Sequence, residues 1–294
     1  MKINKIRLWG PFGLLMLIFF YDVYAKPQIS IITSVFNGDQ FIKSFLQDIT
    51  QQTIFNKCEL ILINANSPGN EYSIIKKFMK KYPNISYIKL KQDPGLYGVW
   101  NIGIKMAKGN FITNANLDDR LAPNCYQAHL NFLLANPQID LVYSDEYITN
   151  QPNETFEKNT ANRVSVYSEF SKQNMITCLP NAHPMWRKTI HDKYGYFDET
   201  FRSVGDWEFW LRAVSKGAQF LKLHAVLGLF YYNPKGLSFG LTDKRYFELI
   251  EICERYKKMF NLSHLSGPEV LNFASQVWQT QTKEIYSTRQ NIDC

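Results

Sequence analysis

Two adjacent carboxylates, Asp118 and Asp119, lie in the segment Asn114-Ala115-Asn116-Leu117-Asp118-Asp119-Arg120, directly after a predicted strand. Carboxylate oxygens are the ligands that Mg²⁺ and Mn²⁺ prefer in proteins. A divalent ion held there can bridge a diphosphate and neutralise the charge of a departing one. The same pair could instead cap a helix beginning near Leu121, because aspartate is a common N-cap residue. The pattern alone leaves both readings open.

A further carboxylate, Asp206, precedes a predicted helix in the run Asp206-Trp207-Glu208-Phe209-Trp210. Its aromatic neighbours could face a sugar or another flat apolar ligand. Asp206 is a candidate general base, although an aspartate before a helix is also a common N-cap. Glu208 is a competing candidate for the base. It stands two residues further along the helix, so its side chain should point to a different face.

The elements that must position these residues alternate between short apolar strands and amphipathic helices. The sequence predicts strands at 29–32, 59–63, 85–90 and 111–113, and helices at 41–52, 72–81 and 100–108. This alternation is typical of a three-layer α/β domain on a mostly parallel sheet. Ligands of such sheets bind outside the carboxyl ends of the strands. We therefore expect the site in the loops 33–39, 64–70, 91–98 and 114–121, covered by the irregular stretch 150–182.

The rest of the chain divides into two flanking segments. Residues 1–25 have a basic start, an apolar run over 8–20 and small residues Val23 and Ala25 before Lys26, the pattern of a secretory signal peptide. An uncleaved membrane anchor is the alternative. The chain would then be exported or luminal in the first case and membrane-anchored in the second. After a domain at 26–240, with a helix at 206–217, a helical extension is expected at 241–294.

Composition limits the function classes. The 294 residues carry a formal charge of +7 and are 45% hydrophobic, which excludes disorder and a disulfide-framed mini-protein. Removing 1–25 leaves 30 basic and 25 acidic side chains, a charge of +5. The five cysteines form no C-x-x-C pair, so a zinc site is not expected, and the sequence selects no disulfide. Lysines at 76, 77, 80 and 81 are read as a solvated helix face, so no nucleic-acid partner is expected.

The order of several short motifs resembles the family 2 glycosyltransferases, inverting enzymes of the GT-A fold that use nucleotide sugars. Residues 29–37, Ile-Ser-Ile-Ile-Thr-Ser-Val-Phe-Asn, are similar to the family's opening V-S-I-I-T-P-x-Y-N. Residues 93–103 resemble D-x-G-I-Y-D-A-x-N-x-G of one branch, with Gly98 in place of the second aspartate. Residues 116–119, Asn-Leu-Asp-Asp, stand where that branch has N-A-D-D, its version of the D-x-D metal motif. The segments 183–187, 195–199 and 233–238 also resemble family segments.

The resemblance implies a role for each matching residue. Ser34 and Phe36 would line the nucleoside pocket, with Asn64 in place of an aspartate that hydrogen-bonds uracil. Asn116 would meet the ribose, and Asp118 with Asp119 would hold Mn²⁺ or Mg²⁺. Asp206 would deprotonate the acceptor hydroxyl. The donor would be a nucleotide-diphosphate sugar, with a UDP-sugar favoured, and the acceptor a glycan, a lipid-linked molecule or a protein.

Four residues remain less defined. Trp207 and Glu208 are expected on the acceptor side, while His183 lies either near the acceptor or in a structural position. His224 is expected to be a core histidine of a strand, or alternatively a third metal ligand. The missing Q-x-x-R-W motif argues against a processive polysaccharide synthase, and the missing G-x-G-x-x-G argues against a nicotinamide oxidoreductase. The asparagines at 64 and 116 leave open a non-catalytic nucleotide- or sugar-binding relative.

Overall fold

The apolar runs of the first half of the chain form a parallel sheet. The computed structural model describes residues 26–237 and 242–285, so the predicted signal peptide or anchor at 1–25 lies outside the described residues. The parallel strands lie in the order β3 (Ile85–Lys89), β2 (Cys58–Asn64), β1 (Ile29–Val35) and β4 (Phe111–Asn114). β1 and β2 are almost wholly buried because helices cover both faces of the sheet.

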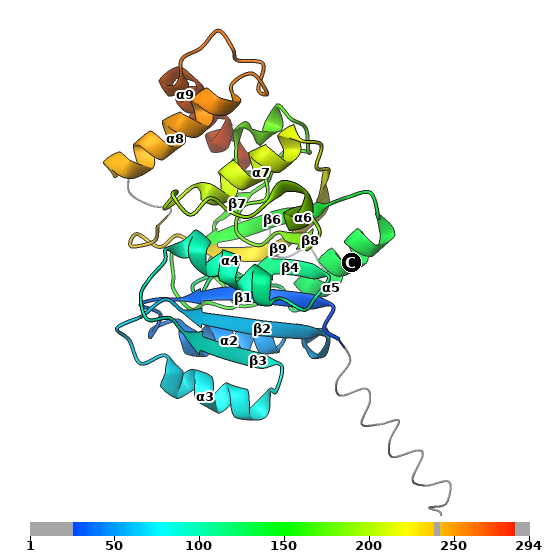
Figure 1. The fold of residues 1–294 in the computed structure, drawn as a ribbon, viewed down its shortest axis with the longest axis vertical. Helices are drawn as coiled ribbons and strands as arrows, with labels where there is room; N and C mark the ends of the chain where they lie inside the picture. The colour runs from blue at the N-terminus through cyan, green and yellow to red at the C-terminus, as the bar shows by residue number, and fades with distance from the viewer. Residues whose placement is uncertain (1–25, 238–241, 286–294) are drawn as a thin grey trace, which may run out of the picture.

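Helices lie on both faces of the sheet (Figure 1), and a hydrophobic cluster on each face holds the three layers together. On one face, Phe45 and Ile49 of α2 (Ile42–Thr50) pack with Ile29 and Ile31 of β1, together with residues of α3 (Tyr72–Lys81) and α5 (Cys125–Ala135). On the other face, Ile32 of β1 packs with α4 (Leu96–Met106) and α7 (Gly205–Ser215). The predicted three-layer α/β architecture is therefore confirmed.

The second half of the chain extends the same sheet. β8 (Met185–Arg187) lies antiparallel between β4 and β6 (Leu141–Thr149), and β7 (Arg163–Ser165) continues antiparallel beyond β6. The long β9 (Phe220–Tyr231) runs parallel to β6 and also pairs with the short β5 (Arg120–Leu121). The stretch 150–182 is irregular as expected, with β7 and the 3-10 helix η2 (Asn174–Ile176) between loops. The short α6 (Ile190–Tyr194) precedes α7.

The C-terminal segment is helical and packs on the main core. It contains α8 (Asp243–Tyr256), α9 (Gly267–Gln281) and β10 (Thr282–Glu284), which pairs with β7. Ile252 and Val270, from α8 and α9, are fully buried in the same cluster as Trp210 of α7. The described part of the predicted extension thus shares the core of the α/β domain.

Two local predictions differ from the structure. The helix expected at 100–108 begins at Leu96, directly after Gly95, whose φ of 81° lies in the left-handed region that suits glycine. His224 was expected in the core or at a metal. It lies on β9 but is exposed and pairs with Glu169 at 3.3 Å, so neither alternative describes it.

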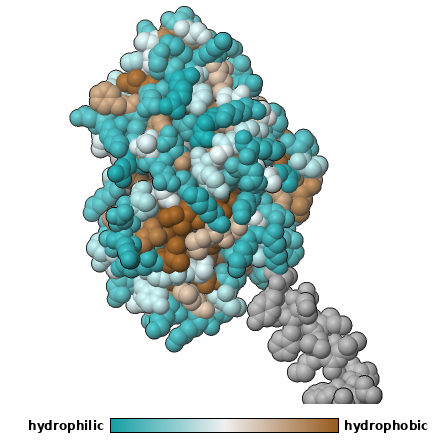
Figure 2. All heavy atoms as spheres, in the orientation of Figure 1, coloured by the Kyte–Doolittle hydropathy of each residue, from teal (hydrophilic) through white to brown (hydrophobic). Residues whose placement is uncertain are grey.

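No helix within residues 26–237 and 242–285 is both long and apolar enough to cross a bilayer. Figure 2 shows a mostly hydrophilic face, with hydrophobic side chains gathered over α4 and the strands beside it. The four cysteines in the described ranges, Cys58, Cys125, Cys178 and Cys253, are all free thiols.

Candidate active site

The carboxyl ends of β1, β2 and β4 meet at one edge of the sheet. Val35 lies beside Asn64 in the register of β1 and β2, and Ile32 lies beside Asn114 in that of β1 and β4. The loops that follow these strands therefore converge, as the sequence predicts. This edge is where ligands of parallel α/β sheets bind.

The buried Glu71 joins the loops after β1 and β2. Its Oε1 accepts hydrogen bonds from the backbone N–H of Gly38 at 2.8 Å and from the hydroxyl of Ser67 at 2.6 Å. Ser67 Oγ in turn accepts from the backbone N–H of Asn37 at 3.0 Å. A Cβ on Gly38 would lie 2.4 Å from a methyl carbon of Leu117 in the loop after β4, so glycine here leaves room for the Leu117 side chain. The edge is thus held in one shape by a buried carboxylate.

The three residues predicted to meet the nucleoside lie at this edge but differ in availability. Phe36 is 46% exposed, and Ser34 is partly exposed. Asn64 is only 2% exposed, and its Oδ1 accepts from the backbone N–H of Ser67 at 2.8 Å. The side-chain oxygen that would read a base is therefore engaged in shaping its own loop.

The acidic loop after β4 separates the roles of its two aspartates. Asp119 accepts from the backbone N–H of Tyr231 through Oδ1 at 3.1 Å and from Asn116 Nδ2 through Oδ2 at 2.9 Å. Burial and the neighbouring Asp118 raise the pKa of Asp119 well above its usual range. Asp118 accepts from Asn233 Nδ2 through Oδ2 at 2.9 Å, and its Oδ1 has no partner among the described residues. Asp118 is the carboxylate with an oxygen free for a ligand.

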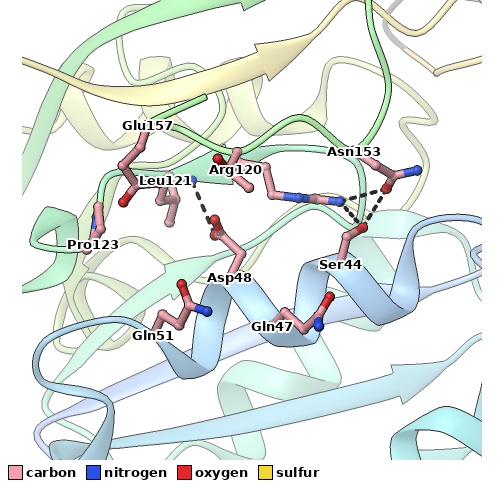
Figure 3. A pocket seen from close by; sticks show the side chains of 10 residues that line it. Ser44, Gln47, Asp48, Gln51, Arg120, Leu121, Pro123, Asn153 and Glu157 are labelled. Carbon is pink, nitrogen blue, oxygen red and sulfur yellow. Dashed lines mark hydrogen bonds between the residues drawn. The ribbon is translucent and has the colours of Figure 1, made fainter. Parts of the chain in front are cut away.

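The Arg120 side chain links this loop to neighbouring elements through hydrogen bonds (Figure 3). Its Nη1 donates to the carbonyl oxygens of Leu117 and Asp119, on either side of Asp118. Its Nη2 donates to Ser44 Oγ on α2 and to Asn153 Oδ1. The side chain is 2% exposed. A planar guanidinium can serve four acceptors at once, so Arg120 ties the acidic loop to α2 and to the irregular stretch 150–182.

The protein's own oxygen atoms would fill only some of the coordination positions of a divalent ion at this site. Among the described residues, no three His, Cys, Asp or Glu side chains gather as a metal site would require. The free Oδ1 of Asp118 supplies one carboxylate ligand, whereas the oxygens of Asp119 accept from Asn116 of the same loop and from Tyr231 of β9. Mg²⁺ commonly binds one or two carboxylates together with substrate phosphates and water. The residues present therefore fit an ion that completes its shell with a diphosphate.

Asp206 lies in the first turn of α7 and faces the start of α4. The hydroxyl of Tyr97 donates to Asp206 Oδ1 at 3.1 Å. A Cβ on Gly205 would lie 2.7 Å from the Tyr97 ring, so glycine at 205 allows the two helices to meet here. Burial raises the pKa of Asp206, while hydrogen bonds from the Trp207 backbone and Tyr97, and the charge of Arg245, oppose that rise. The result is a partly buried carboxylate that accepts a proton more readily than an ordinary aspartate.

Glu208 and Trp207 point away from this carboxylate into the protein. Glu208 is 1% exposed and binds Arg212 at 3.0 Å, Arg255 at 3.4 Å and the Tyr256 hydroxyl at 3.2 Å. It therefore joins α7 to the end of α8. Trp207 is 6% exposed, and its Nε1 donates to the carbonyl oxygen of Met175 at 2.8 Å. Neither side chain contacts Asp206 among the described residues, and their place on the acceptor side stays a prediction.

His183 belongs to a buried polar network behind the acidic loop. Its Nδ1 lies 3.2 Å from Glu146 Oε2, and its Nε2 lies 3.2 Å from Ser144 Oγ. The ring stacks on His129, whose pKa burial lowers to about 3. A Cβ on Gly228 would lie 2.2 Å from the His183 ring. These contacts favour the structural alternative for His183.

Four residues of the site region were not singled out by sequence reasoning: Tyr97, Arg120, Asn233 and Arg245. Tyr97 and Asn233 lie inside quoted motifs, so their positions were marked but their contacts were not. Arg120 follows the two aspartates directly, which was the only signal for it. Arg245 lies in a helix with an ordinary polar pattern, and no local pattern indicates its approach to Asp206.

A three-layer α/β domain with an acidic loop at the carboxyl edge of its parallel strands, and a second carboxylate at a helix start, is the GT-A class of architecture. The chain belongs to glycosyl transferase family 2, whose family model matches residues 30–195. The predicted family is confirmed, and the protein is a glycosyltransferase by membership.

Two relatives from Bacillus subtilis (strain 168) are similar to this chain in sequence. The minor teichoic acid biosynthesis protein GgaB is 32% identical over 115 residues, which are 38% of this chain and 13% of GgaB. The uncharacterized glycosyltransferase YwdF is 26% identical over 194 residues, covering 63% of this chain and 68% of YwdF. The chain thus spans only a small part of GgaB.

Two solved structures share the fold. S. aureus TarS 1-349 in complex with UDP-GlcNAc superposes with a TM-score of 0.64 at 16% identity, covering 83% of this chain and 69% of that one. The mannosyltransferase PcManGT from Pyrobaculum calidifontis, in complex with GDP-Man and Mn²⁺, gives 0.62 at 13% identity, covering 90% and 81%. At these identities the likeness establishes the architecture.

Proposed function

We propose that the protein transfers a sugar from a nucleotide-diphosphate sugar to an acceptor hydroxyl, with inversion at the anomeric carbon and with the help of a divalent metal. Family membership supports sugar transfer. A nucleotide-sugar donor is supported by the structural neighbours, of which one was solved with UDP-GlcNAc and the other with GDP-Man and Mn²⁺. We favour a UDP-sugar, with Ser34 and Phe36 at the nucleoside.

The observation that carries the mechanism is the Tyr97–Asp206 contact at the start of α7. The Asp206 carboxylate takes the proton of the acceptor hydroxyl as the hydroxyl oxygen bonds to the anomeric carbon. The bond from that carbon to the donor diphosphate breaks, and its electron pair leaves with the nucleoside diphosphate. Attack opposite the leaving group inverts the configuration. The raised pKa of Asp206 suits a group that must accept a proton near neutral pH.

Asp118 would hold the metal through its free oxygen, steadied by the bond from Asn233. The ion, when bound, would offset the negative charge that develops on the departing diphosphate. Asp119 and Arg120 contribute by keeping the loop in shape. Asp118 and Asp206 thus divide the chemistry, since one must stay ionised as a ligand and the other must take up a proton.

A second candidate is a nucleotide- or sugar-binding relative without catalysis. The engagement of Asn64 Oδ1 and Asn116 Nδ2 inside their own loops favours it, because neither asparagine group is then offered to a donor. The unoccupied oxygen of Asp118 and the raised pKa of Asp206 favour the enzyme.

The two candidates differ in turnover. The full chain is assayed for UDP-sugar hydrolysis and transfer, with Mn²⁺ or with a chelator, and UDP affinity is measured alongside. We expect Asp206→Asn to lose about 10²- to 10⁴-fold in rate, the usual contribution of a general base, with UDP affinity kept. Asp192→Asn, an exposed aspartate on α6, is the matched control and should behave as wild type. Equal turnover in all three proteins would contradict the proposed base, and UDP binding without any turnover would favour the second candidate.

The acceptor and the location of the protein are further parts of the proposal. The acceptor is a glycan, a lipid-linked molecule or a protein, and the chain is either exported or luminal after cleavage of 1–25, or anchored through that segment. Cell fractionation with N-terminal sequencing of the mature chain separates these cases: a chain beginning at Lys26 shows cleavage, and a membrane-bound chain beginning near Met1 shows an anchor.

A further inference from the structure

A positively charged pocket of about 200 Å³ lies between the start of α7 and the start of α8. Arg202, Lys244 and Arg245 line it together with the hydroxyl-bearing Ser203 and Thr242, and no acidic side chain is among the described residues that line it. The volume is below the roughly 300–1,000 Å³ of sites that enclose whole drug-sized ligands. The pocket therefore suits one charged group of a larger molecule.

The pocket adjoins the proposed base. Arg245 is half-buried and close enough to Asp206 for their charges to influence each other. Its Nη1 donates to the carbonyl oxygen of Leu237 at 3.0 Å, and its other donors have no partner within the described ranges. Arg202 Nη1 lies 3.3 Å from the position a Cβ would take on Gly95, two residues before Tyr97. Arg245 thus approaches Asp206 from α8, while Arg202 lies beside the glycine that precedes α4.

The nearby carboxylates offset only part of this charge. Glu248 lies under the pocket, but its oxygens accept from the backbone N–H groups of Arg202 at 2.7 Å and Ser203 at 3.1 Å, and from the Ser203 hydroxyl at 3.1 Å. Glu248 is 7% exposed, so it faces the backbone rather than the opening. Asp206 and Glu248 both act on the charge of Arg245, so together they balance at most two of the three cations. An anion is the ligand that this arrangement would bind.

We propose that this pocket binds a phosphate group of the acceptor, so that the protein glycosylates a hydroxyl close to a phosphate ester. The proposal rests on the proposed function, because it places the acceptor at Asp206. The donor diphosphate is the other possible source of phosphate. The acceptor is favoured because Arg245 lies close enough to Asp206 for their charges to act on each other, whereas Asp118, the expected partner of the donor diphosphate, is contacted by Asn233 and by none of the three cations.

The test measures binding of glycerol 3-phosphate to the full chain with saturating UDP and Mn²⁺, with glycerol as the uncharged comparison. We expect wild type to bind glycerol 3-phosphate and not glycerol. Arg202→Ala combined with Lys244→Ala should weaken that binding ~10-fold or more, because two charged partners are lost. Both side chains are exposed, so the variant should fold, which thermal unfolding checks. Lys258→Ala, an exposed lysine beyond the far end of α8, is the control with unchanged binding.

A second titration with UDP and Mn²⁺ alone distinguishes the source of the phosphate. UDP affinity should stay within about twofold of wild type in the double variant, since exposed charges at a distance contribute little. A parallel loss of UDP affinity would assign the pocket to the donor and overturn the proposal. Equal glycerol 3-phosphate binding in the double variant and in Lys258→Ala, or no binding by wild type, would also overturn it. Failure of the proposed function would look different, because Asp206→Asn would then keep its turnover while the binding results stood.

Discussion

The Tyr97 hydroxyl donates a hydrogen bond to Asp206 Oδ1 at 3.1 Å and so joins the first turn of α4 to the first turn of α7. Tyr97 is 2% exposed, and burial together with Asp206 raises its pKa well above the usual value, so the phenol keeps its proton and stays a donor. The contact orients the carboxylate that the proposed mechanism uses as its base.

Tyr97→Phe should therefore change the pH dependence of the reaction. Asp206 acts in its ionised form, so the rate falls as pH falls through the pKa of Asp206. Losing a hydrogen bond to the ionised form raises that pKa further, and the acidic limb of kcat/KM should move to higher pH, with kcat reduced about tenfold. The profile is measured against Tyr246→Phe on α8 as control. Superimposable acidic limbs would show that Tyr97 does not act on Asp206.

Alanine at 119 should lower stability, whereas alanine at 118 should remove metal stimulation. Asp119→Ala leaves the Tyr231 N–H and Asn116 Nδ2 without their acceptor, so we expect a loss of about 1–3 kcal/mol in unfolding free energy. Asp118→Ala removes the free ligand oxygen and should abolish stimulation by Mn²⁺ with little change in stability. Urea unfolding and Mn²⁺ titration of both variants decide the matter. Stimulation retained in Asp118→Ala would exclude it as the ligand.

Arg120→Lys should loosen the acidic loop while keeping the charge. A lysine cannot reach the carbonyls of Leu117 and Asp119 and also Ser44 on α2, so acceptors inside the protein lose their donors. We expect a loss of about 2–3 kcal/mol in unfolding free energy and a raised KM for the donor. Arg163→Lys, on β7 with one hydrogen bond to Asn150, provides the comparison. A KM for the donor equal to that of this control would show that the contacts of Arg120 do not affect donor binding.

Asp48→Asn should remove a pH dependence of stability. Burial raises the pKa of Asp48 to about 7, against 3.8 for an unperturbed aspartate. Between these values the folded protein holds a proton that the unfolded chain releases, so this group destabilises the fold as pH rises, by up to ~1.4 kcal/mol per pH unit. The unfolding free energy of the variant should therefore rise relative to that of wild type through that pH window, and the difference should stay constant above it. Urea unfolding between about pH 4 and 8 measures the gain. Curves that stay parallel throughout would contradict the raised pKa.

Local sequence patterns predicted the elements and the place of the site. The apolar run at 60–63 in the predicted strand 59–63 indicated a strand buried on both faces, and the spacing of Phe41, Phe45 and Ile49 indicated a helix; β2 and α2 confirm both. Because parallel strands end at a common edge, the predicted loops after them converge there. The long strands β6 and β9 and the environment of His224 were not predicted, since their patterning depends on neighbours far along the chain.

Which carboxylate is free was decided only by the tertiary structure. Asp118 and Asp119 are equivalent in type and adjacent in sequence, yet the Tyr231 N–H, 112 residues away, binds Asp119. Glu208 stands two residues from Asp206, but Arg255 and Tyr256 hold it inside. The sequence by itself determined the strands, the helices and the positions of the acids at their ends, because these follow from local periodicity. The availability and proton affinity of each acid follow from burial and from distant partners, which only the folded chain brings together.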